Sequence, residues 1–130
     1  MTEPLTAIAH HKYANITTFR RNGEAKKTPI WFAVRDGKAY LWTNAYTWKV
    51  KRIKNDPRCA LTPCDVRGKT EKGPTVPGVA RLLSDASEIA RAKAAFRQKY
   101  GLGFAFGELF GRLRPGSQHV YLEITAGEGA

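Results

Sequence analysis

Residues 13–43 read YANITTFRRNGEAKKTPIWFAVRDGKAYLWT, and this run sets the architecture of the chain. It holds three segments rich in β-branched and aromatic residues, separated by the dipeptides Asn22-Gly23 and Asp36-Gly37. Both dipeptides favour tight hairpin turns, because their residues tolerate a positive φ. The pattern therefore predicts a meander of three antiparallel strands, at Tyr13–Arg21, Lys26–Val34 and Ala39–Thr43. In the second of these, Ile30, Phe32 and Val34 alternate with Trp31 and Ala33 and are expected to face one side.

The remaining strands are short and follow the meander. They are predicted at Arg58–Cys64, Val79–Leu83 and Gln118–Thr125. Six short strands, mostly linked by hairpins, favour a closed barrel over a parallel sheet, since closure removes exposed strand edges. We therefore expect a mainly β fold, a β-barrel with short helices. It forms a single domain over residues 1–130, of which 1–12 are an N-terminal arm.

Two helices interrupt the strands. The first is predicted at Trp48–Asn55, where Asn44 or Thr47 can cap its start. The second begins after Asp85, in a sequence that resembles a capping box, and runs to Tyr100.

Composition narrows the class of protein. The 130 residues are 42% hydrophobic and 25% charged, which favours a globular domain over a disordered chain. Apolar runs are too short to span a bilayer and the N-terminus lacks a signal-like core, so we expect a cytoplasmic protein without a membrane span. Cys59 and Cys64 have no further zinc ligands nearby in the sequence, and we expect them to be reduced and packed.

The net charge of +11 is concentrated in the first part of the chain. Residues 1–72 hold 15 lysines and arginines against 6 acidic residues, a net charge of +9. This asymmetry favours an anionic partner, which the charge alone leaves open between nucleic acid, an anionic membrane face and a phosphorylated small molecule. A generally basic surface without such a partner explains the same numbers.

The segment WTNAYTWKVKRIK, residues 42–54, has the features of a phosphate site. A strand ends as a helix begins, and a helix N-terminus offers free backbone N–H groups and partial positive charge. Side chains that could add hydroxyl donors and positive charge are Thr43, Thr47, Lys49, Lys51 and Arg52. A solvated basic helix with a threonine cap fits the same pattern.

The residues Thr28, Pro29, Ile30 and Trp31 suggest a second part of the same site. Proline lacks a donor for the strand ladder, so it belongs at a sheet edge or bulge. Free backbone groups beside aromatic rings there would suit a flat tricyclic ring with imide edges. A core strand with an edge proline is the simpler alternative.

The order of six segments carries a family resemblance. They are NITTFRRNG (15–23), TPIWFAVRDGKAYLWTNAYTWKVKRIKNDPR (28–58), LTPCDVRG (61–68), VPGVARLL (76–83), RQKYG (97–101) and RLRPGSQHVYLEIT (112–125). This order resembles the pyridoxamine-phosphate-oxidase-like, FMN-binding split barrels. It is most similar to their actinobacterial branch of deazaflavin (coenzyme F-420)-dependent oxidoreductases, over about residues 13–126.

The resemblance implies a homodimer with two cofactor sites at the subunit interface. The cofactor phosphate would lie against Thr43, Thr47, Lys49 and either Lys51 or Arg52, with the ring along residues 28–31. Trp48 stands where flavin-using relatives often have an arginine, which favours coenzyme F-420 over FMN. Arg67 could reach the cofactor of the partner subunit.

The resemblance also implies an activity, hydride transfer to a small electron-poor organic acceptor. Tyr100, Lys99 or solvent could supply the proton, and the catalytic residues stay unknown. The C-terminal arginine-bearing segment of true pyridoxamine phosphate oxidases is lacking, so that activity is not expected. Phe104, Phe106 and Phe110 are expected to pack in the core or a dimer interface, or else to line an apolar pocket.

Two alternative functions stay open at this stage. One is an FMN- or haem-binding split barrel without this activity. The other is a nucleic-acid-binding barrel, which would use the same positive charge with exposed aromatic rings for stacking. We expect a homodimer that acts on a small-molecule substrate, and we expect no nucleic-acid partner. We expect Trp31, Trp42 and Trp48 to lie near one rim as an apolar patch that a second copy covers.

Overall fold

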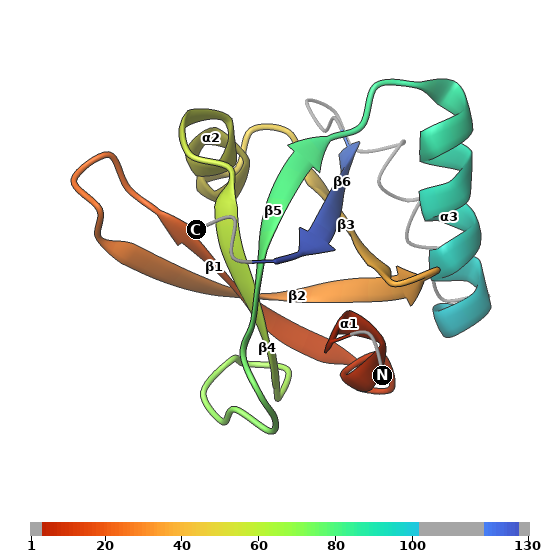
Figure 1. Cartoon of the computed structure of the whole chain (residues 1–130), viewed down its shortest axis with the longest axis horizontal. Coiled ribbons are helices and arrows are strands. Elements are labelled where there is room, and N and C mark those ends of the chain that lie inside the picture. Colours follow the sequence, from red (N-terminus) through yellow and green to blue (C-terminus); the bar gives the residue numbers. More distant parts are fainter. Residues whose placement is uncertain (1–3, 102–118, 128–130) are drawn as a thin grey trace.

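In the computed structural model, which describes residues 4–101 and 119–127, the predicted meander is present. Its three strands are followed by a helix, two strands, a second helix and a last strand (Figure 1). The elements are α1 (Pro4–Ala7), β1 (Tyr13–Phe19), β2 (Ala25–Arg35), β3 (Lys38–Asn44), α2 (Trp48–Asn55), β4 (Arg58–Cys64), β5 (Val76–Leu82), α3 (Ala86–Tyr100) and β6 (His119–Ala126).

The six strands close into an antiparallel barrel in the order β1-β2-β3-β6-β5-β4. This confirms the mainly β barrel predicted from the strand pattern. Figure 1 shows α3 lying along one side of the barrel and α2 at the end where the β1–β2 hairpin projects. No helix among the described residues is long and apolar enough to cross a membrane.

Strand β2 changes partner halfway along its length. Residues 25–31 pair with β1, whereas residues 32–35 pair with β3. Within the described part of the chain, the first half of β2 therefore has a strand neighbour on one side. Pro29 lies in this half, opposite Asn15, where a missing ladder donor is tolerated. The predicted edge position of the proline is confirmed.

The barrel interior is filled by alternating strand residues and is covered by α2. Ile30 and Phe32 point into the same core cluster, as their spacing in β2 predicted. Val50 and Ile53 of α2 are buried in this cluster too. Because these two side chains anchor the inner face of α2, its basic residues are left for the outer faces of the helix.

A second core lies between the barrel wall and α3. Phe96 of α3 is fully buried there with Tyr40 and Tyr121. Trp31 and Trp42 are partly buried against this cluster, and the Trp31 ring stacks on Tyr100 at 4.8 Å. The expected rim of three exposed tryptophans is therefore wrong, since α3 covers two of them and leaves Trp48 exposed.

Several element boundaries differ from those predicted. β1 ends at Phe19 because Arg20 and Gly23 already close the hairpin, with the Gly23 N–H donating to the Arg20 carbonyl at 2.8 Å. β5 begins at Val76, three residues early, because Val76 pairs with Leu61. The bounds predicted for α2 are confirmed.

The predictions for the cysteines and for the start of α3 are confirmed. Cys59 and Cys64 are buried free thiols, and burial raises the pKa of Cys59 to about 12, as expected for packed cysteines. Asp85 caps α3 by accepting a hydrogen bond from the Glu88 N–H. Phe104, Phe106 and Phe110 lie outside the described residues.

Candidate functional site

The N-terminus of α2 is positioned by a turn that follows β3. The Asn44 side chain accepts a hydrogen bond from the Tyr46 N–H at 2.9 Å, and the Thr47 hydroxyl donates to the Asn44 carbonyl at 3.0 Å. Thr47 is the N-cap residue, yet its side chain makes no capping hydrogen bond. The first turn of α2 also contains no acidic residue. The partial positive charge of this helix end is therefore uncompensated by a cap or a first-turn carboxylate.

A pocket of about 370 Å³ lies between this helix and the first half of β2; we call it the β2–α2 pocket. Its lining residues are Lys26, Lys27, Thr28, Thr47, Trp48, Lys49 and Arg52. The pocket thus joins the one-sided half of β2 to the start of α2. These are the two segments that the sequence pattern predicts to form one site.

The two walls of the β2–α2 pocket differ in their charge balance. On the β2 wall, Lys26 and Lys27 each bind a carboxylate at 2.9 Å, those of Glu24 and Glu71. On the α2 wall, Lys49 and Arg52 form no ion pair with any described carboxylate. Partial burial lowers the pKa of Lys49. An anion that enters the pocket therefore meets unpaired positive charge on the α2 wall.

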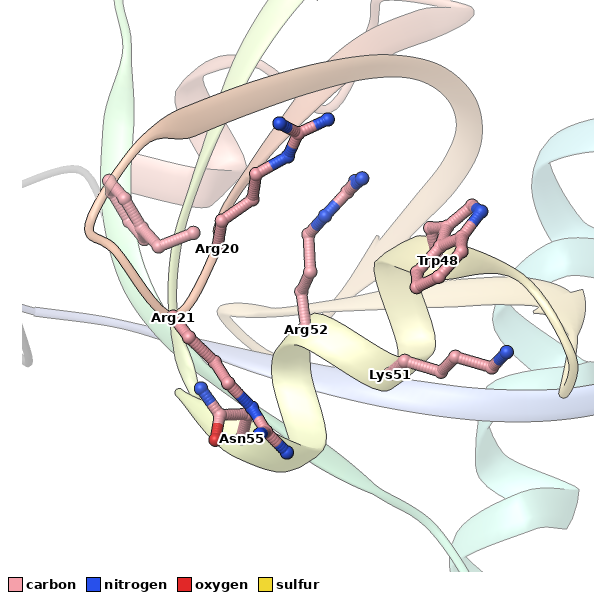
Figure 2. A pocket seen from close by; sticks show the side chains of 7 residues that line it. Arg20, Arg21, Trp48, Lys51, Arg52 and Asn55 are labelled. Atoms are coloured by element: carbon pink, nitrogen blue, oxygen red, sulfur yellow. The ribbon is translucent and has the colours of Figure 1, made fainter.

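A larger concavity of about 700 Å³, the hairpin groove, lies on the other side of Trp48 and Arg52 (Figure 2). Its lining residues are Phe19, Arg20, Arg21, Trp48, Lys51, Arg52 and Asn55. Figure 2 shows Arg20 and Arg52 extending in the same direction and Arg21 reaching towards Asn55. The groove and the pocket share Trp48 and Arg52, so they form one continuous basic surface.

Trp48 forms an exposed aromatic wall between the two concavities. Its side chain is 68% exposed, and the Lys51 ammonium lies 4.6 Å from the centroid of its ring. This cation–π contact holds a positive charge next to an apolar surface. The hairpin groove thus combines four cationic side chains with the rings of Trp48 and Phe19.

The structure brings together six of the eleven residues proposed for the site. Thr28, Thr47, Trp48, Lys49, Lys51 and Arg52 line one or both concavities. Thr43 lies outside both linings, in β3 opposite Val120. The Ile30 side chain is in the barrel core and Trp31 stacks on Tyr100, so a cofactor would meet their backbone rather than their side chains.

Pro29 and Arg67 lie on a neighbouring part of the surface. Arg67 is exposed on a turn at residues 65–70, which Asp65 closes by accepting hydrogen bonds from Lys69 and Thr70 N–H groups. Gly68 of this turn has a φ of 75°, and a Cβ there would lie 3.2 Å from Pro29 and closer still to Asn15. The turn is therefore packed against β2 at the proline, beside the stretch proposed for the ring.

Sequence reasoning missed one half of this basic surface. Arg20, Arg21, Lys26 and Lys27 flank the β1–β2 hairpin and contributed only to the overall charge count. Their signal was present as two basic pairs on either side of Asn22-Gly23. Their placement opposite α2 depends on tertiary packing.

The two candidate proton donors are engaged elsewhere. Lys99 donates to the carbonyls of Phe32 and His11 at 2.8 and 2.5 Å, and burial lowers its pKa to about 8. The Tyr100 hydroxyl lies 2.7 Å from the Lys12 carbonyl and 2.8 Å from that of Phe32, and burial raises its pKa. Neither residue lines the β2–α2 pocket or the hairpin groove. Both tie α3 and the N-terminal arm to β2.

The closed six-stranded barrel, with a pocket where β2 has a strand neighbour on one side only and α2 begins, has the architecture of a split barrel. The model of the pyridoxamine 5'-phosphate oxidase family, PNPOx_N, matches residues 2–128. The chain therefore belongs to this family. No curated protein matches it.

Solved structures share this fold at low sequence identity. A conserved hypothetical protein of Mycobacterium tuberculosis is 22% identical with a TM-score of 0.70, covering 97% of this chain and 81% of its own. The haem storage protein HutZ of Vibrio cholerae is 13% identical with a TM-score of 0.70, with coverages of 97% and 90%. An FAD-binding protein of Mesorhizobium loti is 13% identical with a TM-score of 0.66, with coverages of 98% and 91%.

Proposed function

We propose that this chain is an oxidoreductase that binds coenzyme F-420 and reduces a small electron-poor organic acceptor. The observation that carries the proposal is the α2 wall of the β2–α2 pocket. It combines a helix N-terminus without a side-chain cap, Lys49 in the first turn and Arg52 in the last turn, and neither cation has an ion-pair partner among the described carboxylates. Such a wall suits a phosphate ester, because backbone N–H groups, a helix dipole and two cations converge on it.

The position of the phosphate then orients the rest of the cofactor. On the opposite wall, Lys26 and Lys27 are already paired with carboxylates, so this side has less attraction for a second anion. Within the described residues, the backbone of β2 from Thr28 to Trp31 has a strand neighbour on one side only. Free backbone donors and acceptors there fit the imide edge of a flavin-type ring.

The hairpin groove supports coenzyme F-420 over FMN. Coenzyme F-420 carries an acidic oligoglutamate tail beyond its phosphate, whereas FMN ends at the phosphate. Arg21 and Lys51 extend the basic surface beyond the shared Arg52, and Arg20, which is paired with Glu24 at 3.5 Å, also lines the groove. These cations match a polyanionic tail, and Trp48 separates it from the ring side of the site.

When bound, the deazaflavin supplies hydride chemistry, because a carbon replaces the N5 nitrogen of a flavin. The chain's own residues would bind the cofactor, orient its ring and shield it from water. Lys49 and Arg52 would hold the phosphate, the backbone of β2 would align the ring, and Trp48, which lines both concavities, would contact the cofactor between them. Lys99 and Tyr100 hold backbone carbonyls, so we assign the proton to solvent.

The names of two similar proteins suggest other ligands with which coenzyme F-420 must be compared. Haem and FAD are named for the Vibrio and Mesorhizobium proteins. Haem iron commonly takes a protein ligand such as histidine, and the described histidines His10, His11 and His119 do not line either concavity. The lack of a described histidine in both linings therefore favours a phosphorylated flavin-type ligand over haem.

A side-by-side titration tests the cofactor. We expect purified protein to bind coenzyme F-420 at least about tenfold more tightly than FMN, a difference of about 1.4 kcal/mol. FAD and haem serve as further ligands, and visible absorption spectra identify which one is retained. FMN binding tenfold more tightly than the deazaflavin would reverse the assignment.

The nucleic-acid alternative is tested with single-stranded DNA. A true nucleic-acid binder loses affinity with salt at a log–log slope of about −0.7 per phosphate contacted. We expect no saturable DNA binding at physiological salt. A steep slope together with absent cofactor binding would favour the alternative.

We also propose a homodimer with the cofactor site at its interface. Three large apolar side chains are exposed among the described residues, Tyr46 at 64%, Trp48 at 68% and Val66 at 61%. Tyr46 and Trp48 flank the start of α2, and Val66 is on the turn beside Pro29, so all three border the proposed site. A second copy packed there would cover them.

Light scattering at micromolar concentration should give twice the chain mass of 14.5 kDa. Trp48→Glu should shift the protein towards monomer by placing a charge in the interface. A monomeric wild-type protein that still binds cofactor would contradict an interface site.

A further inference from the structure

The Lys27–Glu71 ion pair joins the β2–α2 pocket to the turn that follows β4. The Lys27 ammonium lies 2.9 Å from Glu71 Oε2. The same oxygen accepts a hydrogen bond of 3.3 Å from the Asn15 side-chain amide, which is buried in β1. These two contacts lower the pKa of Glu71, so its carboxylate is ionised at neutral pH.

The backbone around Glu71 is tied to the barrel. Glu71 forms an antiparallel bridge with Cys64, and the Lys72 N–H donates to the Pro63 carbonyl at 2.7 Å. The Asn15 amide also donates to the Gly68 carbonyl at 2.9 Å. Three connections to β1 and β4 therefore hold the turn that carries Glu71. They keep this carboxylate next to Lys27.

The companion pair on the same wall differs in its anchoring. Glu24, which binds Lys26, lies in the β1–β2 hairpin and also contacts Arg20. Among the described residues, the Glu24 carboxylate is held by the partly exposed Arg20 and Lys26 and not by a buried side chain. Among the cations that line the pocket, Lys27 is thus the one paired with a carboxylate that a buried amide orients.

We propose that Glu71 is a specificity-determining residue of the β2–α2 pocket. By occupying Lys27, it keeps that ammonium from a bound phosphate and directs the phosphate to Lys49 and Arg52 on the α2 wall. The inference rests on the proposed function for the identity of the ligand. The pairing of Lys27 with Glu71 stands without it.

The substitution Glu71→Gln removes the negative charge of Glu71 but keeps a side chain that can hold the turn in place. The glutamine carbonyl can still accept from Asn15, while Lys27 is released. We expect FMN affinity to rise about two- to fivefold, because a negative charge is removed near a dianion and a cation is freed. Riboflavin, which lacks the phosphate, should bind the variant and the wild type equally.

A double-mutant cycle tests whether Lys27 takes over the phosphate. In the wild type, Lys27→Met should weaken FMN binding less than about twofold, since Lys27 is held by Glu71. In the Glu71→Gln background the same change should cost about five- to tenfold, because the released ammonium now contacts the phosphate. Asp36→Asn, which removes one negative charge at the far end of β2, is the matched control and should change affinity by less than about twofold.

Two results would overturn the inference. An equal cost of Lys27→Met in both backgrounds would show that Glu71 acts only as a distant charge. A loss of FMN and riboflavin binding together in Glu71→Gln would show that Glu71 only holds the turn.

A failure of the proposed function would give different results from a failure of the Glu71 proposal. If FMN binds more tightly than coenzyme F-420, the cofactor assignment fails and the cycle still reports on Glu71. If no flavin binds, the same four proteins of the cycle are compared by how far inorganic pyrophosphate raises the melting temperature of each. Absence of a Lys27–Glu71 coupling with that probe as well would overturn the inference.

Discussion

Lys49→Ala is expected to lower the affinity for a phosphorylated cofactor by roughly tenfold to a hundredfold. The substitution removes a charge-assisted contact worth about 1.5–3 kcal/mol from the α2 wall. Lys49 is half-buried and has no ion-pair partner among the described residues, so no neighbouring carboxylate offsets its charge. Calorimetric titration of FMN and coenzyme F-420 into both proteins measures the loss.

The control for Lys49 lies on the same helix. Lys54 is exposed in the last turn of α2 and lines neither concavity, so Lys54→Ala should change affinity by less than about twofold. Riboflavin should bind wild type and Lys49→Ala equally, and stability should stay within about 0.5 kcal/mol. Equal losses for phosphorylated and unphosphorylated ligands would remove Lys49 from the phosphate site.

Gly78→Ala is expected to lower the free energy of unfolding by about 2–4 kcal/mol. Gly78 is in β5 where it pairs with β6, the contact that completes the barrel. A Cβ at this position would lie 2.6 Å from the Thr125 carbonyl oxygen and 2.9 Å from Ile124 Cγ2. Because the first neighbour is backbone, the two strands would have to move apart. Urea unfolding measures the change.

Gly73→Ala is the matched control for this substitution. Gly73 is exposed in the β4–β5 connection, and its Cβ would lie 3.1 Å from a side-chain atom of Pro63, which can shift. We expect a loss of less than about 1 kcal/mol. Similar losses for the two alanine variants would show that the β5–β6 approach is not a constraint on the barrel.

The strands and helices followed from local signals in the sequence. Asn22-Gly23 and Asp36-Gly37 determine two hairpins, because few other residues adopt the positive φ seen at Gly23, Asp36 and Gly37. The bounds of α2 could be predicted because a helix start signal and Pro57 enclose a run with apolar residues at helical spacing. Alternation in β2 likewise identified its inward side chains.

The composition of the site depended on contacts that sequence order does not contain. The sequence placed Lys49 and Arg52 on one basic helix, but it could not place Lys27 opposite them or pair Lys27 with Glu71, 44 residues away. It also could not show that α3 covers Trp31. Local conformation follows from neighbouring residues along the chain. Which charges are paired and which face an open pocket follows from strand register and helix docking, and these are fixed only when the barrel closes.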